Sequence, residues 1–232
     1  MRLGILPAAG KSTRWGGYPK ELLPISNGQT FIARAIDSLQ LSNCDVIAIV
    51  TSQAKISMHA HHIEGSRNIV FAIQQGEELW GAITTAVEFP ADEYYFMMPD
   101  TFLPLEPFPT SLSKSFGLGL FATEEPGRFG VLRDGIIVDK QPSSQPGRAW
   151  GTLAWTRSVV EYWKKESYRS HTDAFNDAMR VFGYDEWHLD YYYDIGNMTH
   201  YAEFLLSEFD RIQYSNQFPG LEDVVGKTLE AT

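Results

Sequence analysis

The order of apolar and polar positions along the chain predicts strands that alternate with helices. Residues 2–7 form a short apolar run, and residues 45–51 (DVIAIVT) form a continuous one typical of a strand covered on both faces. Residues 30–39 place apolar side chains at helical spacing. Further strands are expected at 68–73, 94–98, 117–123, 149–156 and 187–193, and further helices at 79–89, 158–166, 172–182 and 199–209.

The alternation favours an α/β fold with a mostly parallel, mixed sheet and helices on both faces. Asp134-Gly135 lies between two β-rich runs, 128–132 and 136–140, and predicts a hairpin, hence a small antiparallel insertion. We expect a single domain over residues 1–218, followed by a polar tail over residues 219–232. Ligands of open α/β sheets bind beyond the carboxyl ends of the strands, so the segments after residues 7, 98 and 193 are the candidates for a site.

Composition narrows the class of partner. Hydrophobic residues make up 44% of the 232 residues and the net charge is −10, so the chain is globular and poorly suited to nucleic acid or an anionic membrane surface. The charge is uneven, however, because residues 1–20 contain four basic residues and no acidic one. A local anion site at the N-terminus therefore stays compatible with the acidic total.

Two negative observations suggest the compartment. Cys44 is the only cysteine, which excludes an internal disulfide and fits a reducing environment. The stretch 3–9 is too short and too interrupted for a secretory signal, and no run approaches the roughly 20 apolar residues of a membrane helix. We expect a soluble cytoplasmic protein without membrane partners.

The segment after the first strand, LPAAGKSTRWGGYPKELLPI, is the most informative one. The small residues Ala8, Ala9 and Gly10 allow backbone N–H groups to approach an anion closely. Arg14 and Lys20 add positive charge suited to phosphate. The segment is neither a Walker A loop nor a GxGxxG motif, and a glycine-rich turn with solvated basic side chains is the structural alternative.

This segment resembles the signature of sugar-1-phosphate nucleotidyltransferases, especially the glucose-1-phosphate thymidylyltransferase group. Four more elements follow in the order of that family: residues 121–123 with 128–132, residues 138–142, residues 149–152 and residues 193–196. The resemblance implies a Rossmann-like nucleotidyltransferase domain of the GT-A type. The chain departs from the family at Ser12, where a glycine is usual, at Asp139, where a glutamate is usual, and in the short spacing from Arg14 to Lys20, which is closer to cytidylyltransferases and molybdopterin guanylyltransferase relatives.

The resemblance also implies roles for individual residues. Arg14, Lys20 and Asp100 would be catalytic, and Asp100 with Asp194 would hold Mg²⁺, a cation that takes oxygen ligands. The implied nucleotide-binding residues are Ala8, Ala9, Gly10, Lys11, Gln75 and Gly81, and the implied sugar-phosphate residues are Gly130, Lys140 and Gly151. Gln74 is the alternative to Gln75 for recognising the base, and each of these residues has a simpler structural alternative as a turn, cap or solvated edge position.

Three other features carry less weight. His59, His61 and His62 lack the spacing of a metal motif and are interpreted as part of a solvated helix or loop. Trp80 is interpreted as a core residue, and Tyr191–Tyr193 as part of a strand. Trp15 could pack over a nucleotide or shield the loop.

The sequence thus predicts an enzyme that transfers a nucleoside monophosphate from an NTP, with dTTP or UTP favoured, to a sugar 1-phosphate. Phosphoryl chemistry of this kind requires positioning and charge stabilisation rather than a covalent protein intermediate. The alternatives are a cytidylyltransferase or glycosyltransferase on the same fold, or a catalytically silent protein that binds nucleotide sugars.

Overall fold

The computed structural model describes residues 1–63, 65, 68–76, 78–140 and 145–215, and the side chains as far as residue 208. One nine-stranded sheet contains both halves of this chain, with the strand order β10-β6-β9-β4-β1-β2-β3 and the hairpin β7–β8 attached to β9. The strands of the N-terminal half are β1 (Arg2–Pro7), β2 (Val46–Thr51), β3 (Ile69–Ile73) and β4 (Glu93–Met97). All three of their pairings are parallel, as the unbroken apolar runs predict.

The C-terminal half is mixed. Its strands are β6 (Phe116–Thr123), β7 (Gly130–Arg133), β8 (Ile136–Asp139), β9 (Gly147–Thr156) and β10 (Asp185–His188). Strand β9 is antiparallel to β4, β6 and β7, while β10 is parallel to β6. Strand β9 pairs with β6 along one edge, and along the other edge with β7 near Ala149 and with β4 from Thr152 onward, so it joins the parallel half to the hairpin.

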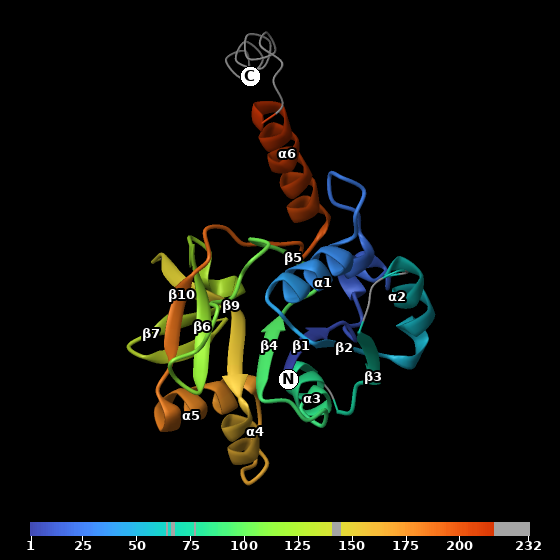
Figure 1. The fold of residues 1–232 in the computed structure, drawn as a ribbon. Coiled ribbons are helices and arrows are strands. Elements are labelled where there is room, and N and C mark those ends of the chain that lie inside the picture. Colours follow the sequence, from blue (N-terminus) through green and yellow to red (C-terminus); the bar gives the residue numbers. More distant parts are fainter. Residues whose placement is uncertain (64, 66–67, 77, 141–144, 216–232) are drawn as a thin grey trace.

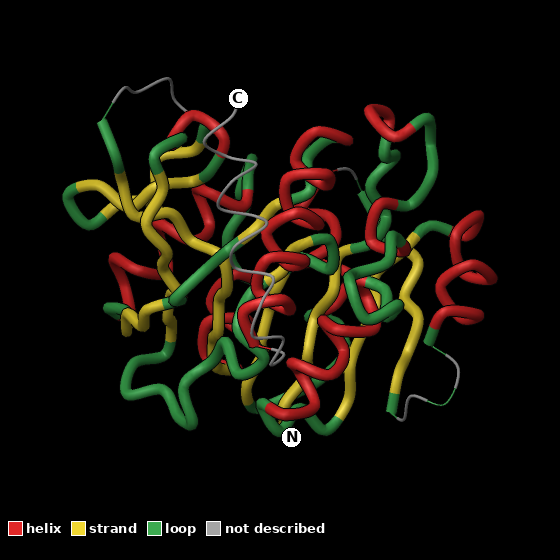
Figure 2. Tube along the Cα trace, turned by 90° about the horizontal axis from the view of Figure 1, so that it is seen from above, coloured by secondary structure: helices red, strands yellow, loops and turns green. Residues whose placement is uncertain are grey.

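Helices cover both faces of the sheet (Figures 1 and 2). They are α1 (Phe31–Leu41), α2 (Ile56–His62), α3 (Glu78–Ala86), α4 (Arg157–Trp163), α5 (His171–Phe182) and α6 (Met198–Ser215). Alternation along β1 divides the core, because Leu3 and Ile5 pack with residues of α3, α4 and α5, whereas Leu6 packs with residues of α1. The expected α/β architecture is confirmed.

Helix α6 extends away from the sheet (Figure 1) and is held at its first turns. Phe204 packs against Phe31 and Phe102, with ring centroids 5.2 and 4.9 Å apart. The Tyr201 hydroxyl donates a hydrogen bond to the carbonyl oxygen of Pro24 over 2.6 Å. These contacts fix the chain just before α6, which supplies part of the site described below.

The hairpin is confirmed in detail. Arg133 pairs with Ile136, which leaves Asp134 and Gly135 as a two-residue turn, and both have positive φ (48° and 77°). This is the backbone conformation that Asp-Gly favours between strands.

The single strand expected at 187–193 is wrong. The structure instead has β10 in the large sheet and β11 (Tyr193–Asp194), which pairs with β5 (Thr101–Phe102) in a separate two-stranded sheet. Aromatic residues suit a strand and a packed turn equally well, so the run of tyrosines concealed the break. The change of sheet brings Asp194 opposite Thr101, next to Asp100 in the chain.

The expected boundary at residue 218 and the tail at 219–232 lie outside the described residues. No helix in the part of the chain that the structure describes is both long and apolar enough to cross a membrane.

Candidate active site

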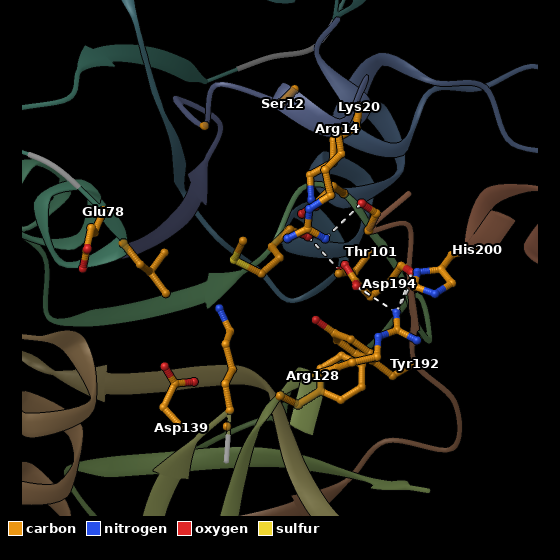
Figure 3. Close-up of a pocket in the computed structure, with 18 of the residues that line it drawn as sticks. Ser12, Arg14, Lys20, Glu78, Thr101, Arg128, Asp139, Tyr192, Asp194 and His200 are labelled. Atoms are coloured by element: carbon orange, nitrogen blue, oxygen red, sulfur yellow. Dashed lines mark hydrogen bonds and ion pairs between the residues drawn. The ribbon is translucent and has the colours of Figure 1, made fainter. Parts of the chain in front are cut away.

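A cavity of about 880 Å³ opens at the carboxyl ends of β1 and β4 (Figure 3). Its walls come from five parts of the chain: the loop after β1, the start of α3, the segment 98–101 after β4, the β7–β8 hairpin with β9 and α5, and the segment from Tyr192 to His200. Of the residues predicted for the site, the cavity brings together Gly10, Arg14, Lys20, Asp100, Gly130, Lys140 and Asp194. Gly10 and Asp194, which are 184 positions apart in the sequence, thus share one space.

The loop after β1 is tightly turned. A single 3₁₀ turn spans Thr13–Trp15, and Ser12 before it has φ 48° and ψ 40°, in the left-handed region. Glycine favours this region, which accounts for the glycine that the family usually has here. The departure at Ser12 therefore leaves the loop geometry in place and adds local backbone strain.

Two side chains of this loop contact the segment before and within α6. Arg14 Nη1 donates a hydrogen bond to the carbonyl oxygen of Gly196 over 3.4 Å. Trp15 packs edge-to-face on Tyr201, with ring centroids 5.9 Å apart. Trp15 thus lies at the mouth of the cavity and also joins the loop to α6.

Lys20 and Asp100 form an ion pair at the base of the cavity. The Asp100 side chain is only 4% exposed, and burial together with the charge of Asp194 raises its pKa, although Lys20 acts in the opposite direction. Burial opposes the charge of Lys20, but Asp100 more than offsets this and raises the pKa of the lysine. Lys20 therefore stays protonated and paired with Asp100.

Asp194 is bound by Arg128. Arg128 Nη2 donates to Asp194 Oδ2 over 3.1 Å and lies 3.0 Å from Nδ1 of His200 (Figure 3). The same guanidinium pairs with Glu125 through Nη1. The sequence motif at 128–132 includes Arg128 but gave it no role. Its role in holding Asp194 depends on a contact between residues 66 positions apart.

The far wall comes from the hairpin, β9 and α5. Lys140 directly follows β8 with φ 43°, and Asp139 and His171 lie on the same wall. Burial lowers the pKa of His171, while Asp139 has the opposite effect. Trp150 Nε1 and His171 Nδ1 are buried without a hydrogen-bond partner among the described residues, as is Trp15 Nε1 at the mouth. Such atoms are rare in folded proteins, and all three belong to residues that line the cavity.

Several predicted residues do not line the cavity. The Gln75 side-chain amide donates to the carbonyl of Ile73 (3.2 Å), and the Gln74 amide donates to that of Glu78 (2.9 Å), so both amides bond locally. Gly81 is buried, and a Cβ on it would lie 2.7 Å from the carbonyl oxygen of Gln75. This glycine allows α3 to approach the 75–76 backbone closely. Ala8, Ala9 and Lys11 likewise lie outside the lining residues.

Gly151 has a different neighbour from the one expected. A Cβ at this position would lie 2.7 Å from the ring of Tyr192, so the tyrosine occupies the space that the glycine leaves open. Tyr192 stacks on Phe121 at 4.1 Å and itself lines the cavity. Tyr192 is a site residue that the sequence analysis assigned to a strand.

The interpretation of the histidines as solvated is wrong for His59. Its side chain is completely buried, with Nε2 donating to Glu21 Oε1 over 2.9 Å and Nδ1 3.1 Å from the Thr51 hydroxyl. His61 and His62 are exposed, as expected. Helix α2 has one face toward the core, and no sequence signal showed that His59 has a carboxylate partner there.

The interpretation of Trp80 as a core residue is confirmed. Trp80 packs edge-to-face on Trp163 and Tyr168 against the core. Burial raises the pKa of Cys44 to about 12, which makes its thiolate scarce at neutral pH.

Four carboxylates line the cavity, and Asp100 and Asp194 are the two predicted to hold a divalent cation, beside Glu78 and Asp139. No group of three or more His, Cys, Asp or Glu side chains in the described ranges is arranged around a common metal position. Mg²⁺ commonly takes only one or two protein carboxylates and completes its shell with water and phosphate oxygens. Burial, and after it the charge of Asp194, raises the pKa of Asp100, and a bound cation would oppose both effects, so the donor set fits Mg²⁺.

Comparisons with known proteins agree with this architecture. Residues 4–106 match the family model described as MobA-like NTP transferase domain. A protein assigned as a glucose-1-phosphate thymidylyltransferase from Bacillus anthracis superposes with a TM-score of 0.78 at 17% identity, over 89% of this chain and 94% of its own. A UDP-glucose pyrophosphorylase in complex with UDP-glucose superposes with a TM-score of 0.70 at 20% identity, over 91% of this chain and 99% of its own. A UTP-bound UGPase from Acinetobacter baumannii superposes with a TM-score of 0.72 at 15% identity, over 99% of this chain and 98% of its own.

A search of curated proteins finds no match. The described chain nevertheless has the same α/β fold as these solved structures. The match to the MobA-like NTP transferase domain model, over residues 4–106, includes the loop after β1 and Asp100. The resemblance inferred from the five motifs is confirmed at this level.

Proposed function

We propose that this protein transfers a nucleoside monophosphate from an NTP to a sugar 1-phosphate and releases pyrophosphate. One observation carries the proposal: a single cavity combines cations on a small-residue loop, two neighbouring carboxylates and a further lysine on the opposite wall. Two polyanions need to be brought together for this reaction, and these charges are placed to accept one on each side.

The chemistry would proceed by in-line displacement. A phosphate oxygen of the sugar 1-phosphate forms a bond to the α-phosphorus, and the bond from that phosphorus to the pyrophosphate oxygen breaks. Arg14 would bind the β- and γ-phosphates and stabilise the leaving pyrophosphate, and Lys20 would neutralise charge near the α-phosphate. Lys140 would hold the attacking phosphate on the far wall.

Asp100 and Asp194 would hold Mg²⁺ between these groups. When bound, the cation would screen the repulsion between the two phosphates and polarise the α-phosphoryl group. Lys20 and Arg128 each pair with one of the carboxylates and so fix their positions before substrate arrives. The residues proposed for the nucleotide are Ala8, Ala9, Gly10, Lys11, Gln75 and Gly81, and those for the sugar phosphate are Gly130, Lys140 and Gly151.

The nucleotide we favour is dTTP or UTP, since the similar structures include proteins named for thymidylyl transfer and for UDP-glucose or UTP. The short Arg14–Lys20 spacing favours a second candidate, a cytidylyltransferase that acts on an alcohol phosphate.

The deciding experiment tests dTTP, UTP, CTP, GTP and ATP in all combinations with sugar 1-phosphates and alcohol phosphates. Pyrophosphate release is measured in each combination. Release that requires both an NTP and a sugar 1-phosphate supports the proposal. Release with alcohol phosphates alone supports the second candidate. If the protein binds nucleotide sugars but shows no turnover in any combination, it is a catalytically silent binder, and both candidate activities are contradicted. Transfer of the sugar from an NDP-sugar would identify a glycosyltransferase.

A further inference from the structure

A second charged cluster lies beneath the loop, outside the cavity. Lys55 ends a 3₁₀ turn (Gln53–Lys55) after β2, and it is buried, with only 7% of its surface exposed. Its Nζ donates hydrogen bonds to the carbonyl oxygens of Ala8 (3.2 Å) and Gly10 (2.6 Å) and to Glu21 Oε1 (3.1 Å). These three acceptors use all three ammonium protons, so the buried charge is fully hydrogen-bonded.

The two carbonyl contacts fix the orientation of the loop backbone. All described peptide bonds are trans, and in a trans peptide the C=O and the following N–H point in opposite directions. With the carbonyls of Ala8 and Gly10 directed to Lys55, the N–H groups of Ala9 and Lys11 point away from it, toward the exposed side of the loop. Backbone N–H groups held in this way form an anion-binding concavity.

Glu21 joins this cluster to the other end of the loop. It is 3% exposed and directly follows Lys20, the cation at the base of the cavity. Glu21 Oε1 accepts from both Lys55 and His59, and the other ring nitrogen of His59 lies against the Thr51 hydroxyl at the end of β2. The start and the end of the loop are therefore held to the same buried cluster.

We propose that Lys55 is a positioning residue for the polyphosphate of the nucleotide: it holds the loop carbonyls inward so that the amides of Ala9 and Lys11 face the phosphates, and Glu21 and His59 hold Lys55 in place. The inference rests on the proposed function in assigning a polyphosphate to this loop. Lys55 touches no substrate and acts through the loop backbone.

The variant that tests this is the double substitution Lys55→Met with Glu21→Gln, which removes the clamp without leaving a buried charge unpaired. The matched control is Lys164→Met with Glu88→Gln, an exposed pair 3.3 Å apart.

The measurement is titration calorimetry with inorganic tripolyphosphate and, separately, with a sugar 1-phosphate. We expect the test variant to lose tripolyphosphate affinity by about tenfold or more. Sugar 1-phosphate affinity is expected to stay close to that of the wild type, and the control to match the wild type for both. Unchanged tripolyphosphate affinity in a folded test variant would overturn the inference.

The wild-type protein provides a second test that does not depend on the variant folding. Amide resonances of Ala9 and Lys11 are expected to shift when tripolyphosphate is added, and the absence of both shifts at saturation would overturn the inference. Failure of the proposed function can be distinguished from failure of this inference. Tripolyphosphate binding without turnover of any NTP would contradict the proposed enzymatic activity but not the role of Lys55.

Discussion

Arg14 is exposed at the mouth of the cavity and makes a single long hydrogen bond, to Gly196. Removing its guanidinium leaves no buried group without a partner, so Arg14→Ala is expected to leave the melting temperature nearly unchanged. If Arg14 stabilises the leaving pyrophosphate, kcat is expected to fall by about 100-fold or more, as for other charge-stabilising groups in active sites. Steady-state kinetics with Arg133→Ala, at an exposed hairpin position, as the control would check this, and near-normal turnover in Arg14→Ala would reject the role.

Ser12 adopts a backbone conformation that a residue with a Cβ disfavours. Ser12→Gly is expected to be at least as stable as the wild type, because relief of the left-handed strain offsets the larger entropy of glycine in the unfolded chain. Ser12→Val is expected to lose about 1–2 kcal/mol, because a β-branched side chain is least compatible with positive φ. Urea unfolding of both variants measures the difference, and equal stability of the two would contradict this loop geometry.

At the scale of elements, Glu21 connects the loop to α2 and gives the fold a dependence on acid. Burial alone would raise the pKa of Glu21, but the hydrogen bond from His59 and the charge of Lys55 hold it below its ordinary value of 4.5. A depressed carboxyl pKa contributes stability above the unfolded-state value, and that stability is lost as pH falls through the folded-state value. The wild type is therefore expected to lose this contribution below pH 4.5.

The variant Glu21→Gln isolates this contribution. It removes one partner from a buried ion pair and is expected to cost about 3 kcal/mol at neutral pH. Its free energy of unfolding is then expected to fall less steeply than that of the wild type as the solution is acidified below pH 4.5. Unfolding curves from pH 7 to about 3.5, beside the exposed control Glu88→Gln, measure the two slopes. Parallel slopes for Glu21→Gln and the wild type would contradict the assignment.

At the scale of the whole molecule, the cavity is assembled by both halves of the sheet, and its carboxylates already have protein partners. Asp100 pairs with Lys20 and Asp194 with Arg128, so the fold does not depend on a metal for charge balance. Chelation of divalent ions is expected to lower turnover by about 100-fold or more. The melting temperature of the ligand-free protein is expected to change by no more than about 1 °C. Restored activity after Mg²⁺ is added back is the control, and full activity in chelator would remove the metal from the proposal.

Local pattern was sufficient for most of the fold. The runs at 2–7 and 45–51 became β1 and β2, and the Asp-Gly turn became the hairpin, because each of these signals depends on neighbouring residues alone. The run 187–193 was misassigned because its division between two sheets depends on β5, some 90 residues earlier. Pairing partners at that distance leave no trace in local periodicity.

The candidate site was located only in part. The loop cations and the two aspartates follow strands or begin turns, so motif order was sufficient to identify them, and all four line one cavity. Tyr192, Arg128 and His171 were not assigned to the site, because each reaches the cavity through packing between distant elements. Lys55 and His59 were missed for the same reason, since a buried ion pair cannot be distinguished from solvated charge in a single sequence.

The sequence by itself determined the alternation of strands and helices, the family resemblance and the concentration of positive charge in the first 20 residues. These properties depend on neighbouring residues and on residue type. The tertiary structure alone decided which charges are paired, that Tyr192 fills the space over Gly151, and that a buried lysine holds the loop from below. Those outcomes depend on distances between residues far apart in the chain, and only the packing of the complete sheet sets such distances.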